Sequence, residues 1–247
     1  VEQCEQDGLE PMSINPVVGE CNDSRINQIQ KRVVGADEVR QAFASASEEF
    51  EEGDVGAGAG TICYGLKGGI GSASRVIRIG EKEYTIGVLV QSNFGATEDF
   101  VLNGESVGAK ILDWKQEKDD MAASEEDKGS IMSILATDLP LTSRQLRRIL
   151  RRTGVGIART GGYTGHGSGE VMIGFTTANR IPSGAEEELL QIQAIPEHVI
   201  NRAFLAAAEA EQEAILNSMT AAERTRGQAG ELYYSLSEYL EDQDSKQ

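Results

Sequence analysis

The sequence contains few of the residues that bind metals or form disulfide scaffolds. It has three cysteines, Cys4, Cys21 and Cys63, and two histidines in 247 residues. This small and scattered set fits neither a zinc motif nor a disulfide framework. We therefore expect no metal and no other cofactor. Free thiols favour a reducing compartment, which we take to be the cytoplasm.

The sequence also lacks long hydrophobic runs and an excess of basic residues. None of its apolar stretches approaches the roughly 18 residues that a membrane-spanning helix needs. Acidic residues outnumber basic ones by 40 to 23, which gives a formal net charge of −17. Binding to a nucleic-acid backbone depends on Lys and Arg. We therefore expect neither a membrane nor a nucleic acid as a partner.

The remaining composition is typical of one globular domain. Apolar residues make up 39% and charged residues 26%, and a chain of this length can bury a sizeable core. Aromatic residues contribute only 5%, whereas glycine is frequent, with 28 residues. Many glycines in a globular chain indicate tight turns and close approaches of the backbone. We expect a single domain over residues 1–247.

Hydrophobic periodicity predicts several strands. They are expected at residues 74–79, 83–91, 131–136 and 170–176. Between the second and third of these, Asn103-Gly104 supplies the two positive-φ residues of a tight hairpin turn. The hairpin signal favours antiparallel pairing.

Helical spacing of apolar residues predicts four helices. They are expected at residues 23–34 and 37–50, after the capping-box residue Thr142, and from Pro196 onward. Strands and helices are therefore mixed along the chain. This order favours an α+β fold in which helices cover an antiparallel sheet.

Two segments offer little to bury. Residues 114–128 hold six acidic side chains and three lysines, and we expect an exposed, mobile loop there. Residues 241–247 close the sequence with polar side chains, and we expect a frayed tail.

The Gly129-Ser130 pair lies where the charged loop meets an apolar strand. The loop lets the peptide bond bend, glycine tolerates the distortion, and the strand holds the serine. The Ser130 hydroxyl can then attack the preceding carbonyl and cut the chain. Cleavage leaves Ser130 with a free α-amine, which can act as the base for its own hydroxyl. On spacing alone, the alternative is an ordinary turn before a strand.

Four segments occur in an order that is specific as a set. They are residues 65–75 (Gly-Leu-Lys-Gly-Gly-Ile-Gly-Ser-Ala-Ser-Arg), 87–95 (Gly-Val-Leu-Val-Gln-Ser-Asn-Phe-Gly), 129–131 (Gly-Ser-Ile) and 165–170 (Gly-His-Gly-Ser-Gly-Glu). Together they resemble the DmpA/BapA family of self-processing serine aminopeptidases, formerly peptidase family S58. That family includes the L-aminopeptidase/D-esterase and the β-peptidyl aminopeptidases. The resemblance runs from about Pro16 to about Gly230.

The resemblance implies a fold, a processing event and a set of partners. The fold is a four-layer α/β/β/α sandwich, similar to the N-terminal-nucleophile hydrolases but differently connected. Self-cleavage between Gly129 and Ser130 would give segments 1–129 and 130–247, which stay associated. The expected substrates are small peptides and amino-acid amides or esters. We also expect a homo-oligomer of such cleaved heterodimers.

The resemblance also assigns catalytic roles to four residues. Its nucleophile falls on Ser130, and its supporting serine and glutamate fall on Ser168 and Glu170. Two residues apart in an extended strand, these two side chains share one face. The oxyanion asparagine of the family falls on Asn93, where a side-chain amide can face a developing negative charge.

Two further residues are expected to contact the substrate. The acidic residue that holds the substrate's amino group falls on Glu20, and a carboxylate there selects a free N-terminus. Asn22 occupies the place where the L-aminopeptidase/D-esterase carries a tyrosine near the nucleophile, which leaves the substrate preference open. The family has a further segment ahead of the Pro16 region, and we expect this chain to start within it.

The expected activity is hydrolysis of the amide or ester bond after a small N-terminal residue, through an acyl-enzyme on Ser130. One alternative is an acyltransferase resembling ornithine acetyltransferase, which shares the fold but has threonine as its nucleophile. The other is a non-catalytic binding protein that keeps the scaffold and is never cut.

Overall fold

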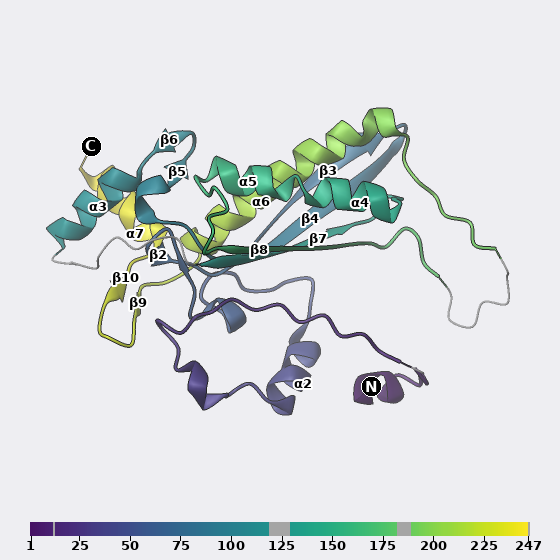
Figure 1. Ribbon diagram of the computed structural model, residues 1–247, viewed down its shortest axis with the longest axis horizontal. Helices are drawn as coiled ribbons and strands as arrows, with labels where there is room; N and C mark the ends of the chain where they lie inside the picture. Colours follow the sequence, from purple (N-terminus) through teal and green to yellow (C-terminus); the bar gives the residue numbers. More distant parts are fainter. Residues whose placement is uncertain (12, 119–128, 182–188, 247) are drawn as a thin grey trace.

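The computed structural model describes residues 1–11, 13–118, 129–181 and 189–246. Its largest sheet has four strands in the spatial order β3-β4-β7-β8 (Figure 1). These strands are β3 (Ile70–Ile79), β4 (Lys82–Asn93), β7 (Ser130–Thr137) and β8 (Gly169–Thr176). All four predicted strands are therefore present, each slightly longer than the periodicity indicated.

The sheet is mixed, which corrects the expectation of a purely antiparallel one. β3, β4 and β7 are antiparallel neighbours, whereas β8 runs parallel to β7. Parallel neighbours need a crossover, and the helices α4 (Ser143–Leu150) and α5 (Thr153–Arg159) lie within it. The predicted capping box at Thr142 is confirmed, since its side chain accepts a hydrogen bond from the Gln145 backbone N–H.

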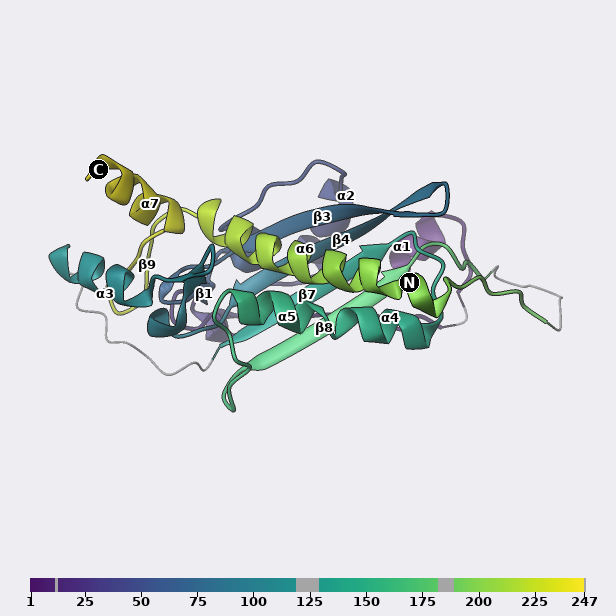
Figure 2. The same cartoon turned by 90° about the horizontal axis from the view of Figure 1, so that it is seen from above.

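Helices cover one face of this sheet (Figures 1 and 2). The long helix α6 (Ile200–Thr220) packs along β3 and β4, and α4 and α5 lie beside it over β7 and β8. The helix start predicted at Pro196 lies close to the observed one, because a short 3₁₀ turn at Glu197–Val199 leads directly into α6. Alternate strand residues supply the core beneath these helices, among them Ile86, Val88, Val90, Ile131 and Leu135, each at most 2% exposed.

The opposite face of the sheet carries exposed apolar side chains. Val76 is 63%, Val171 48% and Phe175 50% exposed, and by strand alternation all three point away from the helix layer. The chain's N-terminal segment, with α1 (Glu2–Gln6) and α2 (Ala36–Ser45), lies on this side (Figure 1). The described residues thus supply a helix layer and one large sheet of the expected sandwich.

Small elements gather at one end of the sheet (Figure 1). They comprise α3 (Gly108–Glu117), α7 (Leu236–Ser245) and three two-stranded ladders: β1 (Ile62–Cys63) with β2 (Leu66–Lys67), β5 (Val101–Leu102) with β6 (Glu105–Ser106), and β9 (Thr225–Arg226) with β10 (Leu232–Tyr233). Further 3₁₀ turns occur at Ile29–Lys31, Gly56–Gly58 and Thr97–Asp99. The predicted hairpin turn is confirmed, since φ is 51° at Asn103 and 84° at Gly104.

Three expectations about local structure were wrong. The predicted loop at 114–128 begins inside α3, because Trp114 is 2% exposed and packs edge-on against Tyr234 and Tyr239; its residues 119–128 lie outside the described part. The predicted tail belongs largely to α7, which a capping box at Ser235 starts. Residues 23–34 form turns rather than an α-helix, because their apolar side chains find no continuous surface to cover.

A carboxyl group is buried in the core between α6 and β7. Glu211 is fully buried, and the Ser133 hydroxyl donates a hydrogen bond to its Oε1. Among the described atoms, its Oε2 has no hydrogen-bond partner. Burial raises the pKa of Glu211 to about 8, against a smaller lowering by the Ser133 hydrogen bond. At pH values between about 4.5 and about 8, Glu211 is therefore protonated in the folded chain and ionised in the unfolded chain.

This buried carboxyl should make stability depend on pH. Because the folded pKa lies above the unfolded one, the stability contribution is complete below about pH 4.5 and is lost as pH rises through about 8. We expect the difference in thermal midpoint between wild type and Glu211→Gln to shift in favour of the variant from pH 5 to pH 8. Glu209→Gln, half-exposed on the same helix, is the control. A difference independent of pH would contradict the assignment.

Candidate active site

Strand register brings two of the predicted catalytic residues together. Asn93, the last residue of β4, pairs with Ser130, the first residue of β7. Residues paired across adjacent strands project from the same face of a sheet. On the other side of Ser130, β8 places Gly169 as its partner, and a Cβ at Gly169 would lie 3.7 Å from the Ser130 Cβ. Space beside the Ser130 side chain is therefore bounded by Asn93 and by a residue without a side chain.

The Asn93 side chain is fixed at both of its polar atoms. Its Oδ1 accepts a hydrogen bond of 3.0 Å from the Ile62 backbone N–H, and its Nδ2 donates one of 3.1 Å to the Asn22 carbonyl. The residue is 7% exposed. Nδ2 carries two hydrogens, and this bond uses one of them. Among the described residues, no hydrogen bond uses the second, so the group retains one donor.

Ser168 and Glu170 meet as their spacing predicts. The Ser168 hydroxyl donates a hydrogen bond of 2.6 Å to Glu170 Oε1, and both residues are half-buried. Ser168 lies just before β8, and Glu170 is the second residue of that strand. Gly169 between them is the β8 partner of Ser130. Because neighbouring residues of a strand project from opposite faces, the Glu170 side chain lies on the face of Ile131, its own β7 partner, rather than on the face of the Ser130 side chain.

The predicted substrate-binding residues lie on a segment that Cys21 holds against the sheet. The Cys21 thiol, 5% exposed, lies 3.7 Å from the Gln91 carbonyl oxygen and 3.6 Å from that of Ser130. Glu20 and Asn22 on either side are exposed. The Asn22 side chain accepts a hydrogen bond of 3.1 Å from the Ser24 N–H, so its backbone rather than its side chain supports Asn93.

Gly129 occupies a position that admits no side chain. A Cβ there would lie 2.0 Å from the Asn93 carbonyl oxygen and 2.7 Å from the Phe94 Cα. Both are backbone atoms, which cannot move aside cheaply. The Gly129 carbonyl oxygen also accepts a hydrogen bond of 3.0 Å from the Gly169 N–H. The residue before Ser130 is thus packed between β4 and β8, next to the predicted oxyanion residue.

Sequence reasoning missed two contributors to this site. Cys21 stands between the two predicted substrate-binding residues, and its apolar character in a polar stretch was the available signal. Ile62 contributes through its backbone N–H, which no side-chain pattern reveals. In the described ranges, no three His, Cys, Asp or Glu side chains gather as metal ligands would.

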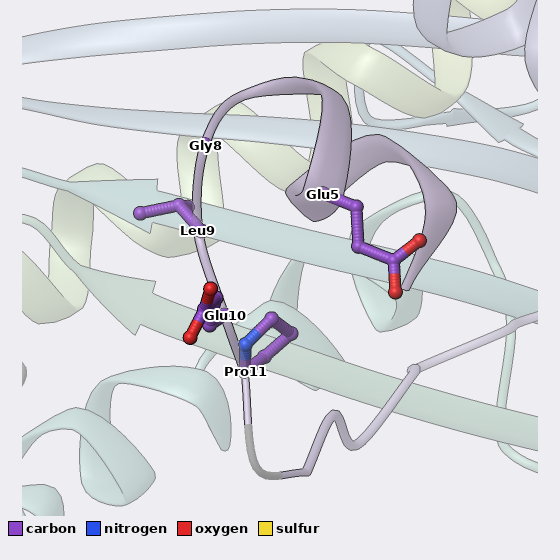
Figure 3. Close-up of a pocket in the computed structure, with 5 residues that line it drawn as sticks. All are labelled: Glu5, Gly8, Leu9, Glu10 and Pro11. Carbon is purple, nitrogen blue, oxygen red and sulfur yellow. The ribbon is translucent and has the colours of Figure 1, made fainter.

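An open hollow of about 510 Å³ lies elsewhere, at the N-terminus (Figure 3). It is formed by one short stretch of chain, lined by Glu5, Gly8, Leu9, Glu10 and Pro11. None of these is a predicted site residue. The described part of the chain also includes no helix that combines the length and the apolar character needed to cross a bilayer.

The mixed sheet, its helix layer and the serine that begins β7 define an α+β fold of the N-terminal-nucleophile hydrolase type. Structural superposition supports this assignment. The L-aminopeptidase D-Ala-esterase/amidase of Ochrobactrum anthropi, a variant of that fold, superposes with a TM-score of 0.79 at 35% identity. The alignment covers 89% of this chain and 60% of that one.

The chain belongs to peptidase family S58, whose sequence model matches residues 1–233. The β-peptidyl aminopeptidase BapA of Sphingosinicella xenopeptidilytica is 36% identical over 220 residues, which are 86% of this chain and 55% of that protein. The PH0078 protein of Pyrococcus horikoshii OT3 superposes with a TM-score of 0.84 at 45% identity, over 97% of this chain and 65% of that one. The chain thus spans just over half the length of this curated relative.

The burial of Cys21 can be tested by thiol alkylation. Burial raises the pKa of the Cys21 thiol, with hydrogen bonds from Ser130 and Met132 acting in the opposite direction, so little thiolate forms at neutral pH. We expect iodoacetamide to modify the half-buried Cys4 at least about tenfold faster than Cys21, as followed by peptide mass spectrometry. Equal rates in the folded protein, with the denatured protein as control, would show that this segment does not stay on the sheet.

Proposed function

We propose that this protein is a self-processing serine aminopeptidase that hydrolyses the amide or ester bond after a small N-terminal residue. The observation that carries the proposal is the pairing of Ser130 with Asn93 across the sheet. The residue that precedes Ser130 is Gly129, where any side chain would clash with the backbone. The names of two relatives, a β-peptidyl aminopeptidase and an L-aminopeptidase D-Ala-esterase/amidase, point to the same chemistry.

Self-processing would begin with attack of the Ser130 hydroxyl oxygen on the Gly129 carbonyl carbon. The C–N bond breaks, the Ser130 nitrogen takes the hydroxyl proton, and an ester links the two residues. Water then hydrolyses the ester, which leaves a Gly129 carboxylate and a free Ser130 amine. Two contacts support this step. The Gly169 N–H already donates to the Gly129 carbonyl oxygen, and Asn93 lies beside it.

Turnover would reuse the same groups on a substrate carbonyl. The free Ser130 amine accepts the proton as the hydroxyl attacks, and the second Nδ2 hydrogen of Asn93 stabilises the oxyanion. The leaving amine takes the proton back, and water releases the acyl group. The Ser168–Glu170 pair, on the strand beside β7, would orient the Ser130 amine from the face opposite the Ser130 side chain, by contact with the main-chain nitrogen, which lies between the two faces.

Recognition of a free N-terminus would rest on the exposed segment beside the nucleophile. A Glu20 carboxylate can pair with the substrate's ammonium, which excludes peptides with a blocked N-terminus. Cys21 holds this residue close to β7. Substrates would therefore be small peptides and amino-acid amides or esters, with Asn22 at the rim of the site.

After cleavage, the segments 1–129 and 130–247 would remain associated. β4, from segment 1–129, forms a full ladder with β7, from segment 130–247, and both contribute to a single hydrophobic core. Cleavage at 129–130 removes no part of that ladder. We propose that the resulting heterodimer assembles further into a homo-oligomer, as the family resemblance implies.

The alternatives have weaker support. An acyltransferase resembling ornithine acetyltransferase is expected to carry threonine at the nucleophile position, where this chain has Ser130. Two of the three relatives named above are aminopeptidases by name, which also argues against an uncut binding protein. An assay for acetyl transfer to glutamate and a denaturing gel distinguish the three.

Replacement of the nucleophile tests the proposal directly. Wild type should run as two bands on a denaturing gel, the second beginning at Ser130, and should hydrolyse amino-acid p-nitroanilides with free amines. Ser130→Ala should run as one band and lose activity by at least about 10³-fold, because both steps need the hydroxyl. Cleavage and activity that persist in this variant would refute the proposal.

The close approach of Gly129 to Asn93 generates a second test. Gly129→Ala places a methyl group against backbone atoms at a cost of about 1–3 kcal/mol, so processing should slow by about tenfold or more. Gly87→Ala in the same strand pair is the matched control, since its new Cβ would meet nothing nearer than 3.9 Å. Band intensities over time give both rates, and equal rates would rule out the packing argument.

A further inference from the structure

The Lys67 side chain is fully buried and ends among backbone carbonyls. Its Nζ donates hydrogen bonds of 2.8 Å to the Gly58 oxygen, 3.1 Å to the Thr61 oxygen and 2.8 Å to the Gly68 oxygen. An ammonium group has three donors, and all three are used. Lysine is almost never fully buried unless it is paired, and none of these partners is a carboxylate. Three backbone carbonyl oxygens therefore form a binding site for the Lys67 ammonium group.

One of these carbonyls belongs to the peptide group that also holds Asn93. The Thr61 carbonyl oxygen accepts from Lys67, and the N–H of the same peptide group, that of Ile62, donates to Asn93 Oδ1 over 3.0 Å. In a trans peptide the C=O and N–H point in opposite directions, and no cis peptide occurs among the described residues. A single rigid plane thus links the buried ammonium to the asparagine side chain.

We propose that Lys67 is a positioning residue that sets the direction of the Asn93 amide through the peptide between Thr61 and Ile62. This inference rests on the proposed function, in which Asn93 stabilises the oxyanion. The ammonium keeps the Thr61 oxygen turned toward itself, so the Ile62 N–H stays turned toward Asn93. Contact with a charge also polarises the peptide and strengthens its N–H as a donor.

Loss of the ammonium would weaken the hold on this peptide plane, because one of two donors to the Thr61 oxygen would be removed. The Thr61 oxygen would retain its 3.0 Å hydrogen bond from the Gly68 N–H but lose its charged partner. The Ile62 N–H would then hold Asn93 Oδ1 less tightly, and only the Nδ2 hydrogen bond to the Asn22 carbonyl would keep the amide from turning its oxygen toward the oxyanion position. An oxygen there repels the developing negative charge, whereas Nδ2 attracts it. Substrate binding through Glu20 would be unaffected, so the effect falls on kcat rather than on KM.

A double-mutant cycle tests this coupling. Lys67→Met, similar in length but uncharged, should lower kcat for an amino-acid p-nitroanilide by about tenfold or more, with KM changed by less than about twofold. Asn93→Ala should lower kcat by about 10²-fold. In the Asn93→Ala background, Lys67→Met should cost less than a further factor of about two. Lys110→Met, on an exposed lysine, is the control and should match wild type.

The outcomes separate this inference from the proposed function. If Asn93→Ala loses activity but Lys67→Met keeps wild-type kcat, the positioning role is wrong and the aminopeptidase proposal stands. Multiplicative losses in the double variant would show that Lys67 acts only on general stability, which also overturns the inference. If Ser130→Ala remains active, the proposed function fails, and the spectroscopic measurement below decides the contact on its own.

The spectroscopic measurement is an NMR titration of the wild-type protein, so it does not depend on whether a variant folds. Burial lowers the pKa of Lys67 to about 8, with Asp54, Asp23 and Cys63 acting in the opposite direction. In an NMR titration, the Ile62 amide and the Asn93 side-chain amide resonances should therefore shift together with those of the Lys67 side chain. Resonances of Ile62 and Asn93 that stay constant while Lys67 titrates would overturn the link.

Discussion

The ladder between β4 and β7 is the constraint on which the rest of this structure depends. Its register places Asn93 opposite Ser130, and it joins the segments before and after the predicted cleavage point into one sheet. The long helix α6 packs against β4, and Ser133 of β7 donates a hydrogen bond to the buried Glu211 of α6. A shift of one residue in this pairing would turn every side chain of β7 to the other face.

Close backbone packing explains much of the glycine content. At Gly129 a side chain would strike the Asn93 carbonyl, and at Gly71 it would strike α6 at the Ala214 carbonyl, 2.1 Å away. Gly68 and Gly69 belong to the turn that wraps Lys67, where added Cβ atoms would also meet backbone oxygens. Glycine at these positions lets strands, helix and turn approach one another closely enough to fix the site. The site is rigid because its backbone is crowded.

Local patterns were reliable wherever one element could satisfy them alone. The strand around Val88, the Thr142 capping box and the Asn103-Gly104 turn were predicted because alternation, capping and turn geometry act within a few residues. The expected helix at 23–34 failed because a helical spacing of apolar residues stabilises a helix only if a surface exists to receive them. The burial of Trp114, and with it α3, depends on Tyr234 and Tyr239, more than a hundred residues away.

The sequence by itself determined which groups are available and in what order: a serine behind a glycine, a Ser-x-Glu pair, an asparagine at a strand end. The tertiary structure alone decided which of them meet. Strand periodicity sets the face on which a side chain lies but not its partner across the sheet, so the Asn93–Ser130 pairing could not be read from spacing. The backbone contacts from Ile62 and Asn22, and the ammonium of Lys67 behind them, carry no side-chain signature and arise only when distant turns pack together.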